Sequence, residues 1–252
     1  MLSTSDLYLQ RFELGEDLPP EDYVGRLPVV RNLRDCGGFD FTHPVTVFVG
    51  ENGVGKSTLV EALAVRMGFN PEGGTANFNF ATHDSHSSLA EHLRVLRGIR
   101  RHRDGFFLRA ESFYNVASNI DDLDAAGGFG RPVVDSYGGV SLHAQSHGES
   151  FMSLVENRFG GRGLYILDEP EAALSPMRVM RLMALMKHLV DADSQFVVST
   201  HSPMLMAFPG ADVVEVADDG LRRVDYRDTD HYQVMLHFLE NPEQMLSYLL
   251  DE

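Results

Sequence analysis

The sequence contains little cysteine, little lysine and no long apolar run. Its one cysteine, Cys36, excludes a disulfide within the chain and suits a reducing compartment. We expect Cys36 to be a small buried residue rather than a nucleophile. No stretch approaches the ~20 consecutive apolar residues of a membrane-spanning helix, and residues 1–6 lack the basic-then-apolar order of a signal peptide. These absences predict a cytoplasmic protein without membrane insertion.

Positive charge is also scarce, because 21 Lys and Arg against 37 Asp and Glu give a formal net charge of −16. A chain this acidic is a poor general partner for nucleic acids or anionic membranes. The exception is a cluster of arginines that could contact phosphates, made of Arg94, Arg97, Arg100, Arg101 and Arg103. Apolar residues recur through the same segment at helical spacing, at Leu89, Leu93, Leu96 and Ile99. This spacing favours the simpler interpretation, the solvated face of a helix over 89–102.

The order of the predicted elements indicates a single α/β domain over residues 1–252. Irregular insertions are expected near 70–88 and 118–140, where turn-forming and polar residues accumulate. Strands are predicted at 7–14, 45–49, 106–108, 163–167, 195–199 and 212–217, and helices at 89–102, after Ser146, at 176–190 and at 231–250. Strands that alternate with helices favour a mostly parallel central sheet flanked by helices.

The most informative motif follows the apolar run 45–49. It reads Gly50, Glu51, Asn52, Gly53, Val54, Gly55, Lys56, Ser57 and Thr58, which matches the phosphate-binding P-loop pattern G-x-x-x-x-G-K-[ST]. Successive backbone N–H groups of such a loop form an anion nest, and the N-terminus of the following helix adds positive partial charge. We expect Lys56 to reach the β- and γ-phosphates of a nucleotide and the Ser57 hydroxyl to ligate Mg²⁺.

A second motif is an apolar strand that ends in two acids, Asp168 and Glu169. This is the Walker B pattern. We expect Asp168 to hold the hydration shell of Mg²⁺ near Ser57. The side chain of Glu169 points elsewhere because it is the next residue, so it could orient and deprotonate an attacking water.

Two further segments contain candidate contacts to the phosphates of the nucleotide. His201 follows the predicted strand 195–199, where it could donate a hydrogen bond to the γ-phosphate. Upstream, Ser146, Gly148 and Glu149 open a predicted helix in the order Ser-x-Gly-Glu. A helix N-terminus with a hydroxyl and free N–H groups is suited to holding a phosphate.

Along the chain the order is the P-loop, residues 146–149, the Walker B acids, a short turn and His201, and this order resembles an ABC-type ATPase. The resemblance implies binding of ATP and Mg²⁺ and a homodimer in which residues 146–149 of one chain serve the ATP of the other. The sequence of residues 169–176 resembles the soluble AAA-like branch related to overcoming-lysogenization-defect and chromosome-maintenance ATPases more than importers or exporters. Segments 107–112, 146–150 and 200–203 are similar to a family of small bacterial predicted ATPases. This branch implies DNA maintenance or phage defence as the process.

Three positions depart from the family pattern. Glu111 stands near the expected place of the glutamine that contacts Mg²⁺ or water, so we take Glu111 as a candidate metal contact. Residues 146–149 correspond to the ABC signature, and His147 replaces its first glycine. Ser175 replaces the acid of the turn after Walker B. The 90 residues from Lys56 to Ser146 show no sustained heptads, so no coiled-coil arm is expected.

Two alternatives remain open at this point. The chain could be the cytosolic ATP-binding subunit of a membrane transporter, which would require a separate membrane partner. It could also be an ATP-dependent interaction switch with slow turnover, although an intact Glu169 favours at least slow hydrolysis. Nucleic acid remains a possible partner that the acidic net charge does not support.

Overall fold

The computed structural model describes residues 1–15, 18, 22–75, 87–125 and 132–250. A central sheet has the strand order β5-β6-β7-β3-β8-β9, in which only β9 runs antiparallel to its neighbour. Its strands are β3 (Val45–Val49), β5 (Asp104–Arg109), β6 (Gly163–Asp168), β7 (Gln195–Ser199), β8 (Asp212–Ala217) and β9 (Gly220–Arg223). The predicted α/β class with a mostly parallel sheet is therefore confirmed.

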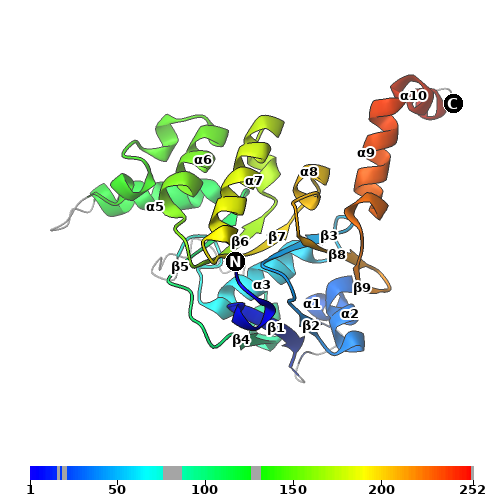
Figure 1. Ribbon diagram of the computed structural model, residues 1–252, viewed down its shortest axis with the longest axis horizontal. Helices are drawn as coiled ribbons and strands as arrows, with labels where there is room; N and C mark the ends of the chain where they lie inside the picture. Colours follow the sequence, from blue (N-terminus) through cyan, green and yellow to red (C-terminus); the bar gives the residue numbers. More distant parts are fainter. Residues whose placement is uncertain (16–17, 19–21, 76–86, 126–131, 251–252) are drawn as a thin grey trace.

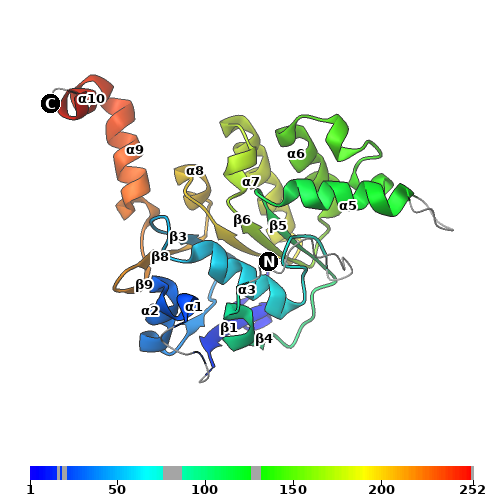
Figure 2. The same ribbon diagram turned by 180° about the vertical axis from the view of Figure 1, so that it is seen from behind.

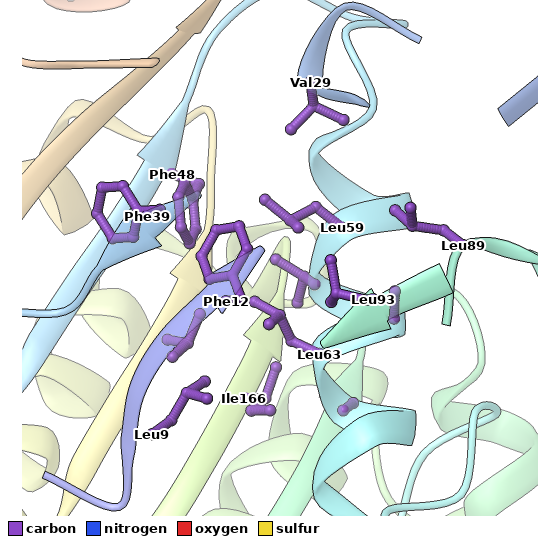
Figure 3. Close-up of a cluster of buried hydrophobic side chains, with 14 of the residues drawn as sticks. Leu9, Phe12, Val29, Phe39, Phe48, Leu59, Leu63, Leu89, Leu93 and Ile166 are labelled. Carbon is purple, nitrogen blue, oxygen red and sulfur yellow. The ribbon is translucent and has the colours of Figure 1, made fainter. Parts of the chain in front are cut away.

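A smaller antiparallel sheet lies on one side of the central sheet. It contains β2 (Phe39–Asp40), β1 (Leu9–Leu14) and β4 (Leu93–Arg97), with β1 in the middle. In Figures 1 and 2, α3 (Lys56–Met67) lies on this same side of the molecule. Figure 3 shows the apolar side chains between these layers, where the ring of Phe12 of β1 lies between Phe48 of β3 and Leu59 of α3.

A second layer of helices covers the opposite face of the central sheet. It is formed by α5 (Phe113–Ala125), α6 (His147–Arg158), α7 (Pro176–Asp191) and α8 (Pro203–Met206). Because side chains alternate along a strand, β6 contributes to both cores: Ile166 packs on the side of α3, whereas Tyr165 and Leu167 pack on the side of α6 and α7. Burial on both faces is typical of a parallel sheet.

Shorter elements complete the chain. They are α1 (Tyr23–Arg26), α2 (Pro28–Cys36), α4 (Leu89–His92), and the 3-10 helices η1 (Thr4–Asp6), η2 (Val133–Tyr137), η3 (Leu142–Ala144), η4 (Pro170–Ala173) and η5 (Tyr226–Asp228). Within the described ranges, no helix is long and apolar enough to cross a membrane.

The C-terminal segment forms two helices that project from the body of the molecule (Figures 1 and 2). They are α9 (Asp230–Glu240) and α10 (Pro242–Leu250), and neither buries a residue. The prediction of one helix over 231–250 was therefore wrong at its centre. Pro242 has no N–H to donate, and it disfavours the helical conformation in the residue before it.

The prediction of a helix over 89–102 was also wrong. One helical turn ends at His92, and the chain then pairs with β1 as β4. Leu93 is buried, but Leu96 is 56% and Ile99 97% exposed, so the apolar stripe of the expected helix does not exist. The helical spacing was coincidental, and backbone pairing with the free edge of β1 determined the structure instead.

Two smaller expectations also need correction. Cys36 is exposed rather than buried, because it lies in the last turn of α2. The first part of the insertion expected at 118–140 is helical, since α5 extends to Ala125. Residues 126–131 of this insertion, and 76–86 of the other, lie outside the described residues.

Asp104, at the start of β5, joins β5 to β6 and α6 through its carboxylate. Its oxygens accept hydrogen bonds from Arg158 Nη1 at 2.7 Å, Tyr165 Oη at 2.8 Å and the Gly160 N–H at 2.9 Å. Burial alone would raise the pKa of this carboxyl, but the three donors bring it below its ordinary value. The ionised carboxylate thus stabilises the fold at neutral pH.

We expect Asp104→Asn to lower the free energy of unfolding by about 1–3 kcal/mol at pH 7, because it weakens a buried charge-assisted network. The folded-state pKa lies below the unfolded value of about 4, so this stabilisation is present above pH 4 and is lost as pH falls through the lower value. Urea unfolding across pH measures the difference. Asp191→Asn is the control, because Asp191 forms only an exposed pair with Lys187. An equal loss at pH 7 and pH 3 would contradict the prediction.

Candidate nucleotide-binding site

Residues 50–55 form the turn that joins β3 to α3, and residues 56–58 begin α3, as the motif predicted. Gly50 and Gly55 both have positive φ, at 139° and 96°. A Cβ atom on Gly50 would collide with the Val216 carbonyl, and one on Gly55 would lie 2.6 Å from Val29 Cγ1. Glycine is therefore required at both positions by backbone conformation and by space. The helix N-terminus that follows is suited to binding an anion.

Lys56 is buried at the first position of α3. Its side chain is curled back so that Nζ donates to the carbonyls of Gly50 at 2.7 Å and Glu51 at 2.9 Å. Burial lowers the pKa of this ammonium, and the nearby carboxylates of Glu169 and Asp168 partly offset that effect. The ammonium has only backbone carbonyls as hydrogen-bond partners within the described ranges, so it can exchange them for an anionic ligand.

Asp168 ends β6 and is 3% exposed. Its carboxylate accepts a hydrogen bond from the hydroxyl of Ser199, Arg109 Nε lies 3.3 Å from its Oδ2, and the Ser57 hydroxyl is close enough to lower the pKa of this carboxyl. Burial raises the pKa of this carboxyl, against the opposing effects of Ser199, Arg109 and Ser57. The structure thus brings together Ser57 and Asp168, the two residues expected to hold Mg²⁺.

Glu169 adopts a left-handed backbone conformation, with φ 47° and ψ 50°. A non-glycine residue in this region costs on the order of 1 kcal/mol and is a common feature of functional sites. Its backbone N–H donates to the Ser199 carbonyl, and its Oε1 lies 3.4 Å from Nε2 of His201. The predicted base and the predicted histidine are therefore neighbours.

His201 is held from several sides. Its backbone N–H donates to Glu171 Oε1 at 2.7 Å, and its Nδ1 lies 2.8 Å from Nε2 of His231. Burial lowers the pKa of His201, and the charge of Lys56 adds to that effect. The ring is consequently neutral at pH 7. Its Nε2 is buried and has no hydrogen-bond partner within the described residues.

The third candidate metal residue, Glu111, lies apart from this pair. Its side chain is 79% exposed, and its Oε2 lies 3.4 Å from Nη2 of Arg109. Arg109 also contacts Asp168 and donates to Glu61 Oε2 at 2.9 Å. An arginine thus stands between Glu111 and Asp168, and the metal role of Glu111 stays a prediction.

The predicted signature segment, residues 146–149, begins α6. Ser146 and Glu149 form a capping box, in which each side chain serves the start of the helix. The hydrogen bonds from Ser146 lower the pKa of the Glu149 carboxyl. A Cβ atom on Gly148 would lie 2.6 Å from Arg178 Nη1 and 2.9 Å from the Ala173 carbonyl. This segment lies in the layer of α6 and α7, whereas the P-loop begins α3 on the other face of the sheet.

Sequence reasoning missed four residues of this site: Arg109, Glu171, Ser199 and His231. Ser199 and Arg109 end strands next to β6, so the parallel-sheet prediction could have placed them near Asp168. Glu171 lies in the predicted turn after Walker B. No sequence signal marked His231, because its contact with His201 depends on how α9 leaves the sheet.

A glycine-rich loop between a buried parallel strand and a helix, with an acid at the end of a nearby strand, defines the P-loop NTPase class of fold. Two family models match the chain within this frame. Residues 30–112, which contain the P-loop, match the family described as "AAA domain". Residues 140–207, which contain Asp168, Glu169 and His201, match the family described as "AAA domain, putative AbiEii toxin, Type IV TA system".

Curated relatives at low identity include proteins described as ATP-binding import and export proteins. The chain is 28% identical over 68% of its length to a cytochrome c biogenesis ATP-binding export protein, CcmA, of Rhizobium meliloti, and covers 83% of that protein. It is 26% identical over 74% of its length to the guanosine import ATP-binding protein NupO of Bacillus subtilis, and covers 39% of it. It is 23% identical over 84% of its length to a brefeldin A resistance protein of Schizosaccharomyces pombe, of which it spans 15%.

Solved structures with a similar arrangement include cbiO1 of Clostridium perfringens, described as part of the ABC transporter complex cbiONQ. It has a TM-score of 0.49 and 16% identity, with 97% of this chain and 99% of that chain covered. The dimeric bacterial ABC transporter cassette MJ0796 has a TM-score of 0.44 and 15% identity, with 76% and 90% covered.

Proposed function

We propose that this chain is a Mg²⁺-dependent ATPase that hydrolyses ATP to ADP and phosphate as a homodimer with two ATPs between its subunits. The observation that carries the proposal is the approach of Glu169 Oε1 to His201 Nε2, 3.4 Å apart at the carboxyl end of β6. An acid and a neutral N–H donor then face the same side of the P-loop, where a terminal phosphate and an attacking water would meet.

The described residues fit a triphosphate with Mg²⁺. Gly50 and Gly55 leave no room for a Cβ, which keeps the backbone N–H groups of the loop accessible. Lys56 and the buried Nε2 of His201 can both donate to phosphate oxygens. Ser57 and Asp168 would hold Mg²⁺, which when bound adds positive charge next to the phosphates.

Each residue then has a separate role in hydrolysis. Lys56 exchanges its bonds to the Gly50 and Glu51 carbonyls for bonds to phosphate oxygens. The Glu169 carboxylate accepts a proton from the water that attacks the γ-phosphate. His201 keeps its Nε2–H directed at that phosphate and stabilises the negative charge that develops on it. Arg109 neutralises Asp168 and must share that carboxylate with the metal.

The homodimer is supported by the position of the signature segment. Residues 146–149 begin α6 on one face of the central sheet, whereas residues 50–58 lead into α3 on the other face. In one chain they belong to different layers, so a site that uses both segments is best formed by two chains. A dimer with twofold symmetry would create two such sites at once.

We expect two inactive variants to restore each other when they are mixed. Lys56→Ala removes the phosphate ligand of the P-loop, and Ser146→Arg blocks the signature segment. In a mixed dimer the P-loop of the Ser146→Arg chain faces the intact signature segment of the Lys56→Ala chain. One of two sites then works in about half of the dimers, so phosphate release should return to about a quarter of the wild-type rate.

A mixture of Lys56→Ala with Glu169→Gln is the matched control. Both residues act on the ATP of their own chain, so this pair cannot form an intact site and should release no phosphate beyond the sum of its parts. Equal behaviour of the two mixtures would reject the shared site.

A transporter subunit is the second candidate, because relatives are described as import and export ATP-binding proteins. This candidate requires a membrane partner. We would test it by purifying the tagged chain from detergent-extracted membranes of its own source cells. A membrane protein retained in detergent and lost at high salt would support it, and a chain found only in the soluble fraction would reject it.

The DNA-maintenance role depends on the exposed arginines around 94–103. Arg100 is already paired with Asp6, and Arg97 donates to the Arg66 carbonyl. Duplex DNA should stimulate phosphate release in a salt-sensitive way if this role is correct. Phosphate release that duplex DNA leaves unchanged, in the wild type and in an Arg101→Ser variant alike, would reject this role.

A further inference from the structure

His231 contacts the site from an element that the proposed chemistry does not use. It is the second residue of α9, and its Nε2 lies 2.8 Å from Nδ1 of His201, with the ring centroids 4.9 Å apart. The start of α9 is anchored, because the buried Thr229 donates to the Tyr226 carbonyl at 2.7 Å and accepts from the Tyr232 N–H. The start of α9, and with it the position of His231, is therefore fixed by the fold.

Both rings are neutral at pH 7. Burial lowers the pKa of His201, and Lys56 lowers it further, while Glu169 and Glu51 oppose the change. Burial also lowers the pKa of His231, and His201 adds to this, against Glu51 and Asp230. A neutral imidazole carries one N–H and one acceptor nitrogen. Only one of the two rings can thus donate in the hydrogen bond between them.

The surroundings of His201 decide which ring donates. Its Nε2 lies 3.4 Å from the carboxylate of Glu169, and an ionised carboxylate only accepts hydrogen bonds. A proton on Nε2 makes this contact attractive and leaves Nδ1 as the acceptor for His231, so the two contacts together favour the Nε2–H tautomer. The hydrogen bond of 2.8 Å then runs from His231 Nε2–H to His201 Nδ1.

We propose that His231 is a positioning residue that fixes His201 in the Nε2–H tautomer, and so keeps its N–H directed at Glu169 and the γ-phosphate. The role toward the phosphate rests on the proposed ATPase function, whereas the tautomer does not. Because His231 belongs to α9, the Nε2–H tautomer of His201 depends on the position of the C-terminal helices. This connects α9 and α10, which bury no residue of their own, to the nucleotide site.

Three variants of the full chain separate this role from a structural one. His231→Leu removes the donor, and His231→Gln keeps an N–H donor at a similar reach. His237→Leu is the control, because His237 is exposed on the same helix. Histidine ¹⁵N NMR without nucleotide reports the tautomer of His201, and steady-state phosphate release gives kcat and KM for ATP.

We expect wild type, His231→Gln and His237→Leu to show His201 protonated at Nε2. His231→Leu should give a mixture of tautomers and a kcat about 10- to 100-fold lower, as for loss of other supporting hydrogen bonds, with KM changed less than about twofold. An Nδ1–H tautomer in wild type, or an unchanged tautomer or kcat in His231→Leu, would overturn the proposal. A wild-type chain that releases no phosphate would overturn the ATPase function and the role toward the phosphate, while the NMR result would still decide the hydrogen bond.

Discussion

Glu169→Gln should lower steady-state phosphate release by about 10²- to 10⁴-fold while ATP binding is retained. The amide has the same shape as the carboxylate but cannot accept a proton from water at neutral pH. Glutamine also tolerates the left-handed backbone of this position as well as glutamate does, since neither is β-branched. The change thus removes one chemical property and leaves the site otherwise intact.

The same variant should reveal the dimer. When hydrolysis is blocked, ATP stays bound, and light scattering with ATP and Mg²⁺ should report a mass of twice 28.1 kDa. Adding Ser146→Arg should return it to monomer, because the arginine blocks the signature segment that grips the second ATP. Glu156→Gln is a suitable control, since Glu156 pairs with Arg181 on α6 and α7. A Glu169→Gln chain that stays monomeric with saturating ATP would falsify the sandwich arrangement.

The arrangement of the candidate site could be predicted because its main parts are local in sequence. The turn after β3 and the acid pair after β6 each occupy consecutive residues, and their chemistry follows from residue type. Parallel pairing of β6 with β7 and of β7 with β3 then brings these carboxyl ends to one edge of the sheet. The prediction that Ser57 and Asp168 meet needed only the strand and helix assignments to be correct.

Other parts could not be predicted because they depend on packing between distant segments. β4 exists because β1 offers a free edge, and local spacing favoured a helix there. Arg109 meets Asp168 and Glu61 only after β5 has paired with β6. His231 reaches His201 only because α9 starts beside the end of β7. In each case the two partners lie 30 or more residues apart, so no single motif contains both.

The second large effect is expected from Lys56→Ala, which should weaken ATP binding by at least about 100-fold, on the order of 3 kcal/mol. Lys56 is 4% exposed, and its ammonium is the cation that the P-loop itself offers to phosphate. Without it, the carbonyls of Gly50 and Glu51 lose a donor, and the negative charges of Asp168 and Glu169 repel the nucleotide with one compensating cation fewer. Isothermal titration with ATP and Mg²⁺ measures the loss.

Lys187 provides a matched control, because Lys56 and Lys187 are the only lysines of the chain. Lys187 is half-exposed on α7 and pairs with Asp191 four residues later, so Lys187→Ala should bind ATP as the wild type does. The two variants have the same change in charge, so a difference between them reports position rather than net charge.

Burial of a cation against backbone carbonyls is costly, so Lys56→Ala should unfold at an equal or higher urea concentration than wild type without nucleotide. Tight ATP binding by this variant would show that the loop holds phosphate through its backbone alone.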